Sequence, residues 1–320
     1  MKFDLRQDAR SRTLITAHRG IAGGNIPCNT LAAFDAALRQ GADMIELDVS
    51  RTADGELFIF HPGMEPAHLC IDRWLDKMCA DEVRQLRFHN QDRTETQYPL
   101  ATLDEALEHL KGRCYINVDK YWSNVGPITE AIRRHNMVDQ VLVKSSYSDE
   151  VVRMMEEVAP DLNFMLILRR VDEHTEHMMK RKLNYVGVEA LFTTDDEPIC
   201  VPEYTEWMHK NGLMTWANSI VYNYRDVIAG THTDDRAVIG YEDDTWGWLI
   251  DRGFDVIQTD WPLALRCYLN SRKGKRSREN VRMCSSGAAV CGLRCAAGAG
   301  KHRHHWRRRR SNVHFCCGFV

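Results

Sequence analysis

Short apolar runs of strand length recur along the first 270 residues, and helix-like segments separate most of them. This alternation restricts the fold strongly, because strand-helix repeats build parallel sheets that are covered by their helices. Eight such units is the number in a closed (β/α)₈ barrel, so the sequence predicts an α/β protein with a TIM-barrel fold. The eight predicted strands are Thr13–Ala17, Met44–Val49, Cys114–Asp119, Gln140–Ser145, Asn163–Leu168, Tyr185–Leu191, Leu213–Asn218 and Asp255–Thr259.

Helical patterns fill most of the intervals between these strands. A helix is expected to begin at Thr102, because Glu105 follows three residues later as in a capping box. The preceding segment, about 62–100, follows a short strand at Leu57–His61 and is too long for a simple loop, so it predicts a small insertion beside the barrel mouth. The other predicted helices cover about 124–136, 148–158, 173–182, 202–211, 243–252 and Pro262 to about Leu269.

Charge is divided unequally along the chain. Residues 271–320 hold 13 Lys and Arg against the single acid Glu279, although the whole chain has a net charge of −3. Because this segment also lacks periodicity, we expect a barrel domain at 1–270 and a disordered, basic, Cys-containing tail at 271–320. A basic tail can bind nucleic acid or anionic lipid, but disorder without a binding role is the favoured interpretation, and the acidic barrel is not expected to bind nucleic acid.

The cysteines and the N-terminus indicate the compartment. Six of the 11 cysteines are scattered through residues 1–270, which favours reduced core thiols over a disulfide framework. The chain has no run of eighteen apolar residues, and its first eight residues are too charged for the apolar part of a signal peptide. We therefore expect a cytoplasmic protein without a transmembrane segment.

Titratable residues stand at the ends of the first two predicted strands. His18 and Arg19 follow the first strand directly, and Glu46 and Asp48 belong to the second. Residues two apart share one face of a strand, so the two carboxylates project together. Neighbouring carboxylates repel each other unless a cation lies between them, and oxygen ligands suit Mg²⁺ or Ca²⁺. The pair therefore predicts a site for one divalent cation.

An ordered set of short motifs surrounds these residues. They are His18-Arg19-Gly20, the helix start Asn29-Thr30, Gly41-Ala42-Asp43 before Glu46 and Asp48, the turn Thr52-Ala53-Asp54-Gly55, and a second histidine, His61. In order and spacing this set resembles the glycerophosphodiester phosphodiesterase family, and similar segments continue to about Leu269. The resemblance implies a metal-dependent hydrolase that cleaves a small-molecule glycerophosphodiester to glycerol 3-phosphate and an alcohol.

Cleavage of a phosphodiester needs an acid, a base and positive charge beside the phosphate. His18 and His61 are candidates for the acid and the base, because imidazole titrates near neutral pH. Which histidine is the acid stays open, as does the choice between water and a substrate hydroxyl as nucleophile. Arg19 is the candidate phosphate clamp, because its planar guanidinium can bind two oxygens at once.

The resemblance also implies a third metal ligand, in a strand where the family shows Asn-x-Glu. Asp119 matches that acid, although its side chain is one methylene shorter. The family often has Lys two residues later, where this chain has Tyr121, and strand parity places Lys120 on the opposite face. Lys144, in an otherwise apolar strand, is the candidate to supply the missing cation to the substrate.

Two further departures from the family pattern flank the histidines. Cys28 replaces the usual Glu before Asn29-Thr30, and Pro62 replaces the Asp that commonly follows the second histidine. Glu65 is a candidate to take over the orienting role of that Asp. Together with Tyr121, these departures suggest one alternative, a weakly active phosphate-binding module. Another barrel phosphodiesterase that acts on phospholipids is a second, separate alternative.

Two residues of later strands are candidates for binding the glycerol part of the substrate. The segment Trp216-Ala217-Asn218 resembles a strand of the family, and Trp216 could form an aromatic wall for the glycerol. Glu189 could reach the same mouth and bind glycerol hydroxyls. The sequence leaves the head group, the metal and the oligomeric state open.

Overall fold

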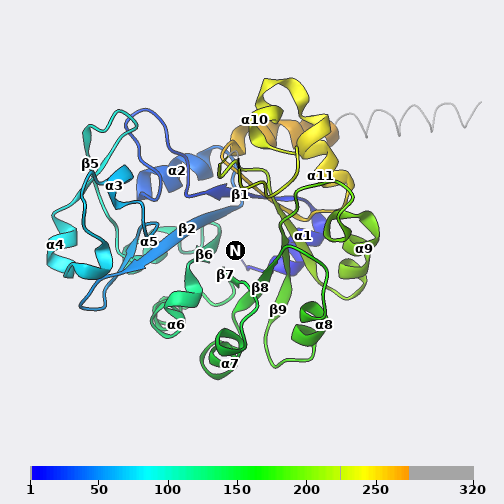
Figure 1. Cartoon of the computed structure of the whole chain (residues 1–320), viewed down its shortest axis with the longest axis horizontal. Helices are drawn as coiled ribbons and strands as arrows, with labels where there is room; N and C mark the ends of the chain where they lie inside the picture. Colours follow the sequence, from blue (N-terminus) through cyan, green and yellow to red (C-terminus); the bar gives the residue numbers. More distant parts are fainter. Residues whose placement is uncertain (1, 224, 274–320) are drawn as a thin grey trace, which may run out of the picture. The chain divides into compact units, whose positions relative to one another are not determined.

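The computed structural model describes residues 2–223 and 225–273, and residues 1–272 form one compact unit. Its centre is a closed ring of eight parallel strands, paired in the order β1, β2, β6, β7, β8, β9, β10, β11 and back to β1 (Figure 1). The predicted TIM barrel is confirmed, and every strand begins and ends within two residues of its predicted bounds. The strands are β1 Leu14–His18, β2 Met44–Arg51, β6 Tyr115–Asp119, β7 Val141–Ser145, β8 Asn163–Leu168, β9 Tyr185–Ala190, β10 Met214–Asn218 and β11 Val256–Thr259.

The register of the first three barrel strands brings the polar residues to common levels. His18 on β1 pairs with Glu46 on β2, which in turn pairs with Asn117 on β6. Asp48 pairs with Asp119 two residues further along the same strands. Because side chains alternate between the two faces of a strand, all five residues point to the inside of the ring.

Helices cover the outer face of the ring and enclose the main hydrophobic core with it. The predicted capping box at Thr102 is confirmed: its hydroxyl accepts the Glu105 N–H at 3.2 Å, and the Glu105 carboxylate accepts the Thr102 N–H at 2.7 Å. The helices between the strands are α2 Leu31–Arg39, α5 Leu103–Leu110, α6 Val125–Arg134, α7 Asp149–Val158, α8 His174–Met179 and α9 Pro202–Lys210. A last helix begins at 262 and continues to 273, where the described residues end.

One end of the barrel is closed by a short helix that the sequence analysis did not predict. Helix α1, Leu5–Ser11, packs Leu5 and Ala9 against apolar side chains that point inward from the strand starts. The hydroxyl of Tyr115 fixes this helix, because it donates to Asp8 at 2.6 Å. The chemistry is thereby confined to the other end, where the strands finish.

Residues 62–100 form a separate layer beside the barrel, drawn in cyan in Figure 1. The short strand β3, Leu57–Ile59, pairs antiparallel with the end of β2 and leads into this layer. A second hydrophobic cluster that includes Phe58, Phe60 and Phe88 holds the layer together. Its elements are α3 Glu65–His68, η1 Leu75–Lys77, α4 Ala80–Arg84 and the antiparallel pair β4 Arg87–His89 and β5 Glu95–Pro99.

The segment after β10 differs most from expectation. The helix predicted at about 243–252 is present, but its first part is the π-helical η5, Asp243–Gly247, which continues directly into α11, Trp248–Asp251. Another π-helical segment, η4 Ala237–Tyr241, precedes it. A short helix, α10 Asp234–Arg236, comes before them. Asp234 of α10 links η5 to the end of β11, because its Oδ1 accepts both Trp246 Nε1–H and the Thr259 hydroxyl at 2.8 Å.

Three other expectations concern the chain as a whole. The six described cysteines are free thiols, but Cys70 and Cys267 are exposed, so not all of them are the core thiols that we expected. Within the described ranges, no helix combines the length and the apolar character needed to cross a bilayer. Residues 271–273 of the expected disordered tail belong to the last helix, and the rest of the tail, from 274 onward, lies outside the described residues.

Candidate active site

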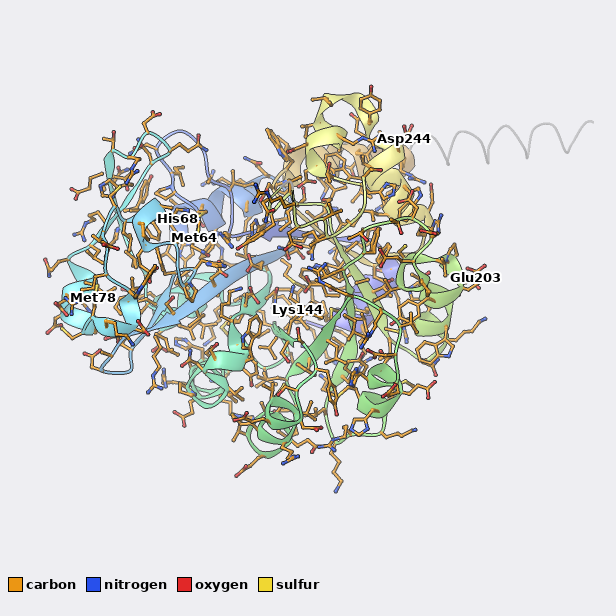
Figure 2. The ribbon with its side chains drawn as sticks, viewed as in Figure 1. Met64, His68, Met78, Lys144, Glu203 and Asp244 are labelled. Carbon is orange, nitrogen blue, oxygen red and sulfur yellow. The ribbon has the colours of Figure 1, made fainter. Side chains whose placement is uncertain are left out.

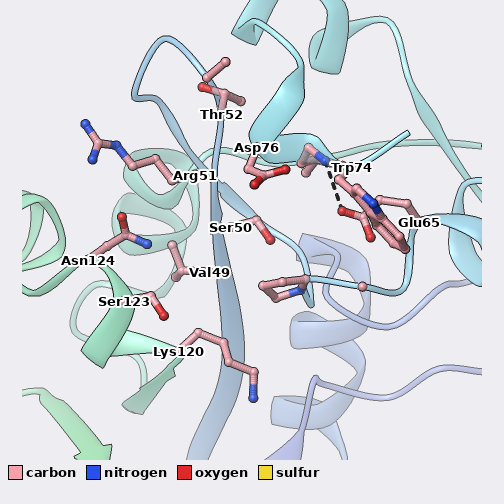
Figure 3. Close-up of a pocket in the computed structure, with 14 residues that line it drawn as sticks. Val49, Ser50, Arg51, Thr52, Glu65, Trp74, Asp76, Lys120, Ser123 and Asn124 are labelled. Atoms are coloured by element: carbon pink, nitrogen blue, oxygen red, sulfur yellow. Dashed lines mark hydrogen bonds between the residues drawn. The ribbon is translucent and has the colours of Figure 1, made fainter. Parts of the chain in front are cut away.

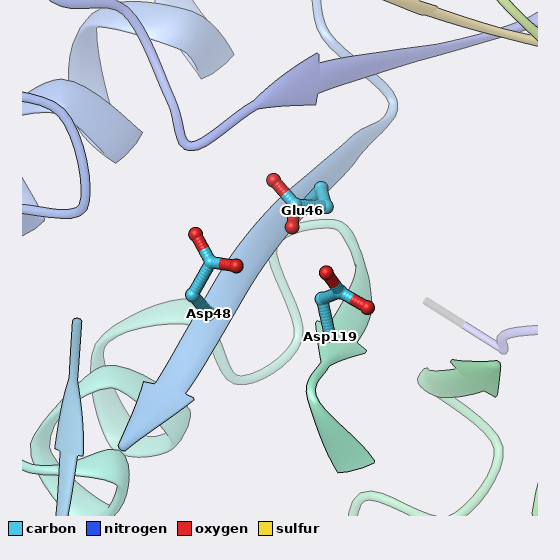
Figure 4. A group of neighbouring side chains, drawn as sticks. All are labelled: Glu46, Asp48 and Asp119. Atoms are coloured by element: carbon cyan, nitrogen blue, oxygen red, sulfur yellow. The ribbon is translucent and has the colours of Figure 1, made fainter. Parts of the chain in front are cut away.

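Three carboxylates from adjacent strands meet at the open end of the barrel. Glu46 and Asp48 of β2 and Asp119 of β6 each offer an oxygen, and these oxygens lie within 4.8 Å of one another (Figure 4). The shorter side chain of Asp119 therefore still reaches the other two acids. Oxygen ligands at such separations suit a hard divalent cation.

The surroundings of the acids also fit a cation. The backbone N–H of Arg19 donates to Glu46 Oε2 at 2.9 Å, and the side-chain amide of Asn29 donates to Asp48 Oδ2 at 2.9 Å. Asp48 Oδ1 is buried and has no hydrogen-bond partner among the described residues, which is costly unless a cation binds there. Burial, followed by repulsion from Asp48, raises the pKa of Glu46 to about 7.

The loop after β1 brings the Arg19 N–H to Glu46 through two left-handed residues. Arg19 has φ of 57° and Gly20 has φ of 75°. A Cβ atom on Gly20 would lie 2.7 Å from the carbonyl carbon of Ala33, on the first turn of α2. Position 20 therefore needs glycine for its backbone conformation and for the close approach of the helix.

We expect Gly20→Ala to lower the free energy of unfolding by roughly 2 kcal/mol or more, because it adds a backbone clash to the left-handed penalty. Gly112→Ala is the matched control: Gly112 has φ of 72°, but nothing lies within 4 Å of the added atom. Urea unfolding of both variants measures the difference. Equal losses would show that the contact with Ala33 is unimportant.

His18 is held by a carboxylate. Its Nδ1 lies 2.9 Å from Oδ1 of Asp260, the residue that follows β11. Burial lowers the pKa of His18, but the hydrogen bond to Asp260 and the charge of Glu46 outweigh it, so the net direction is upward. Asp260 is itself fixed, because its N–H donates to the buried Asp234 at 2.7 Å.

His61 is held by a carbonyl. Its Nδ1 donates to the Pro62 carbonyl at 2.8 Å, which leaves Nε2 to face Asp48 Oδ1 at 3.9 Å. Burial lowers the pKa of His61. The suggestion that Glu65 orients this histidine is wrong, since Glu65 Oε1 accepts the Leu75 N–H at 3.1 Å instead.

Two cations lie beside the acids, and one of them corrects the sequence analysis. Arg19 Nε lies 2.9 Å from Asp48 Oδ2, so this candidate phosphate clamp is next to the acid cluster. Strand parity excluded Lys120, but this residue is left-handed with φ of 60°, and its Nζ lies 2.8 Å from Asp119 Oδ2. Tyr121, in contrast, is fully buried, with its hydroxyl 2.8 Å from that of Thr129.

The candidate residues of the later strands lie deeper in the barrel, where Figure 2 shows Lys144 inside the ring. Lys144 and Glu189 form a buried ion pair at 2.6 Å, and the Asn218 side-chain amide donates to Glu189. Together with His18, His61 and Asp119 they line a cavity of about 240 Å³. This cavity connects the acids to the centre of the barrel.

Trp216 does not form the wall that we expected. Its indole is fully buried and does not line the cavity, because the Lys144 ammonium lies over the ring at 4.0 Å from its centroid. The indole N–H donates to Asn218 Oδ1 at 2.8 Å. Trp216 therefore supports Lys144 and Asn218 from below and is not in a position to contact a ligand in the cavity.

We expect Lys144→Met to cost about 3–5 kcal/mol of folding stability, because it leaves the Glu189 carboxylate buried without its partner. The double variant Lys144→Met/Glu189→Gln should recover most of this loss. Urea unfolding of the two single variants and the double variant measures the coupling. A double variant as unstable as Lys144→Met would contradict it.

Three other residues of the site were not assigned their roles by the sequence analysis, because no local sequence pattern indicates those roles. Lys120 depends on a left-handed turn, and Asp260 meets His18 only because β11 closes the ring beside β1. Asn29 was read as a helix start, although its left-handed backbone turns its side chain to Asp48. Period-two alternation places strand residues, but it says nothing about the residue just after a strand.

A closed parallel barrel whose mouth holds a cluster of acids, two imidazoles and nearby cations defines a class, the barrel hydrolases of phosphate esters. Comparison with known families makes the assignment specific. The model of the glycerophosphoryl diester phosphodiesterase family matches residues 18–264, and the chain belongs to this family of phosphoric diester hydrolases.

Individual relatives agree with the family. The chain is 28% identical over 213 residues to a glycerophosphodiester phosphodiesterase of Caldanaerobacter subterraneus, which covers 63% of this chain and 83% of the relative. It is 23% identical over 278 residues to human Lysophospholipase D GDPD1, and this match covers 80% of this chain and 85% of the relative. A glycerophosphoryl diester phosphodiesterase structure from Parabacteroides distasonis has the same fold, with a TM-score of 0.67 at 18% identity over 85% of this chain and 93% of that one.

Proposed function

We propose that this chain hydrolyses glycerophosphodiesters to glycerol 3-phosphate and an alcohol, with one divalent cation, Mg²⁺ or Ca²⁺, held by Glu46, Asp48 and Asp119. The observation that carries the proposal is the meeting of these three acids, together with the buried Asp48 Oδ1, which has no hydrogen-bond partner among the described residues. When bound, such a cation polarises a phosphoryl oxygen and lowers the pKa of an attacking hydroxyl.

The chain's own cations would bind the remaining phosphate charge. Arg19 and Lys120 lie on either side of the acids, at 2.9 Å from Asp48 and 2.8 Å from Asp119. Both residues line the same cavity as Glu46 and Asp119. Their charge would stabilise the oxygens as negative charge develops in the transition state. Lys120 thus supplies a cation close to where the family's lysine was missing.

The two histidines would divide the proton transfers according to their partners. His18 pairs its Nδ1 with the Asp260 carboxylate, which stabilises an imidazolium, so its Nε2–H is available to protonate the leaving oxygen. His61 donates Nδ1–H to the Pro62 carbonyl, so its Nε2 has a free lone pair that can remove a proton from the nucleophile. His18 is therefore the acid in this proposal and His61 is the base.

The glycerol arm of the substrate would enter the deep cavity. Lys144, Glu189 and Asn218 offer donors and acceptors there that match glycerol hydroxyls. A phosphodiesterase structure from Oleispira antarctica, described as a complex with the product sn-glycerol-3-phosphate, shares the fold with a TM-score of 0.58 at 19% identity over 82% of this chain and 99% of that one. That a protein of the same fold binds this product supports glycerol 3-phosphate as the product proposed for this chain.

The test is to incubate the purified protein with glycerophosphocholine and glycerophosphoethanolamine, with Mg²⁺, Ca²⁺ or EDTA, and to measure glycerol 3-phosphate enzymatically. We expect its release with a divalent cation and none with EDTA. The weakly active phosphate-binding module predicts binding without turnover. Lys120 and the Pro62 carbonyl favour the enzyme, because they compensate for two of the departures that suggested the module.

Lysophospholipids are a second candidate substrate, because one wall of the cavity is apolar. Ile167, Leu191, Ile220 and Ile228 line it. An acyl chain on the glycerol could leave along this wall, and human Lysophospholipase D GDPD1 is among the relatives. Lysophosphatidylcholine, assayed for choline release beside glycerophosphocholine, separates the two substrates. Release from glycerophosphocholine alone would reject the lipid.

A further inference from the structure

A second and larger cleft opens beside the acids (Figure 3). It has a volume of about 790 Å³ and lies between the end of β2, the insertion and η2, Tyr121–Ser123. Lys120 lines both this cleft and the deep cavity. Pro62, the residue directly after His61, also lines the cleft. The two spaces therefore meet at the groups proposed to bind and cleave the phosphate.

A phosphodiester has two arms, and the two spaces differ in the way that its arms differ. The deep cavity is small and holds a fixed set of polar groups, which suits the glycerol that all these substrates share. The cleft is larger, at about 790 Å³ against about 240 Å³, which suits the alcohol that varies between substrates. With the phosphate at Lys120, the head group would extend into the cleft.

The insertion side of the cleft is acidic and aromatic. Glu65 is 2% exposed and lines the cleft; its Oε1 accepts the Leu75 N–H, and its Oε2 has no hydrogen-bond partner among the described residues. A buried carboxylate oxygen without a partner is costly, and a cationic ligand would relieve that cost. Trp74 is 47% exposed in the same cleft, whereas Asp76, which also lines it, is paired with Lys77, whose Nζ lies 3.0 Å from Asp76 Oδ2. An aromatic face beside an unpaired carboxylate is the chemistry that recognises an ammonium group.

The basic residues of the cleft do not oppose such a ligand. The Lys120 ammonium is paired with Asp119, at the phosphate end. Arg51 is directed to the turn after β2, where its guanidinium would lie 3.1 Å from a Cβ atom on Gly55. In the view of Figure 3, Arg51 lies on the opposite side of β2 from Glu65 and Trp74. The negative charge of Glu65 is therefore not paired with either basic residue that lines the cleft.

We infer that this cleft is the head-group site and that Glu65 and Trp74 select substrates with a cationic head group, an alkylammonium such as choline or ethanolamine. This inference rests on the proposed function. Glu65 also fixes the segment that carries Trp74, since its other oxygen holds the Leu75 N–H. Charge and positioning must therefore be separated in the test.

Glu65→Gln separates them, because a glutamine oxygen can still accept the Leu75 N–H while the charge is removed. We expect it to raise the KM for glycerophosphocholine and glycerophosphoethanolamine about tenfold, with kcat nearly unchanged and no change for the uncharged head group of glycerophosphoinositol. Trp74→Leu should raise the KM for glycerophosphocholine about fivefold through loss of the aromatic face. Release of glycerol 3-phosphate is the common readout for all substrates.

Asp72→Asn is the matched control, since Asp72 is an exposed acid of the same insertion that does not line the cleft. It should leave all three KM values unchanged. If Glu65→Gln raises the KM of all substrates equally, or of none, the head-group assignment is wrong while the hydrolase activity stands. If the unaltered protein releases no glycerol 3-phosphate from any of them, the proposed function fails and the head-group assignment fails with it.

Discussion

Replacement of Glu46 by glutamine is expected to lower the turnover of glycerophosphocholine by about 10³-fold or more, which corresponds to about 4 kcal/mol in the barrier. The amide keeps the size of the side chain and can still accept the Arg19 N–H. It removes one of three carboxylates whose oxygens lie within 4.8 Å, and a hard cation binds an amide less strongly than a carboxylate. Initial rates with saturating Mg²⁺ or Ca²⁺ measure the loss.

The same substitution should not destabilise the fold when the cation is absent. Three neighbouring carboxylates repel one another, and burial makes the charge of Glu46 unfavourable. The glutamine variant in EDTA should therefore melt at the same temperature as the unaltered protein or at a higher one. Glu95→Gln, at an exposed position on β5, is the control and should change neither property. A large drop in melting temperature together with the loss of turnover would mean that Glu46 is structural.

The second large effect concerns the histidines. His18→Ala and His61→Ala should each lower the turnover of glycerophosphocholine by about 10²–10⁴-fold, the usual contribution of a positioned acid or base. The p-nitrophenyl ester of glycerol 3-phosphate should distinguish them, because nitrophenolate leaves without being protonated. His18→Ala should recover most of its loss on this ester, and His61→Ala should recover little. Absorbance of nitrophenolate gives the rates.

This comparison depends on the different partners of the two rings. Asp260 holds a charged His18, whereas the Pro62 carbonyl holds a neutral His61. Asp260→Asn should therefore resemble a mild form of His18→Ala and should also be rescued by the nitrophenyl ester. If His61→Ala is the rescued variant, the acid and base assignments are reversed. If neither is rescued, protonation of the leaving group is not part of the slow step.

The barrel could be predicted from the sequence because its determinants are local and repeated. A strand buried on both faces produces an apolar run, and a helix that covers it shows an apolar stripe, so Asn163–Leu168 and the helix at Asp149–Val158 were recognised within their own segments. The acids of β2 were recognised for a similar reason, because period-two alternation places Glu46 and Asp48 on one face.

The parts that could not be predicted depend on single backbone angles or on distant segments. Lys120 was excluded by parity, which fails once the chain turns left-handed after β6. Asp260, the hydrogen-bond partner of His18, lies 242 residues away in the sequence, so no local pattern predicts this contact. Trp216 was predicted to contact the substrate because of its position in a strand. In the folded barrel the Lys144 ammonium lies over its ring and separates it from the cavity. Packing in three dimensions, rather than residue type, settled each of these cases.

The structure explains two of the departures from the family pattern as replacements of a lost group. Pro62 supplies a carbonyl where a carboxylate is usual, and Lys120 supplies an ammonium one residue early. Cys28 is different: burial raises the pKa of its thiol to about 11, so it adds no charge beside the acids, and its Sγ lies 3.8 Å from His68 Nδ1. Two of the three changes thus preserve a function of the lost residue, and the third leaves the acid cluster undisturbed.

The central claim is that Glu46, Asp48 and Asp119 bind one divalent cation on which hydrolysis depends. Titration of EDTA-stripped protein with Mn²⁺, followed by electron paramagnetic resonance, tests it most directly, since Mn²⁺ accepts the same oxygen ligands. We predict one bound ion per chain, binding at least tenfold weaker in Glu46→Gln, and turnover of glycerophosphocholine that rises in proportion to occupancy. Equal binding by both proteins, or full turnover after the metal has been removed, would contradict the claim.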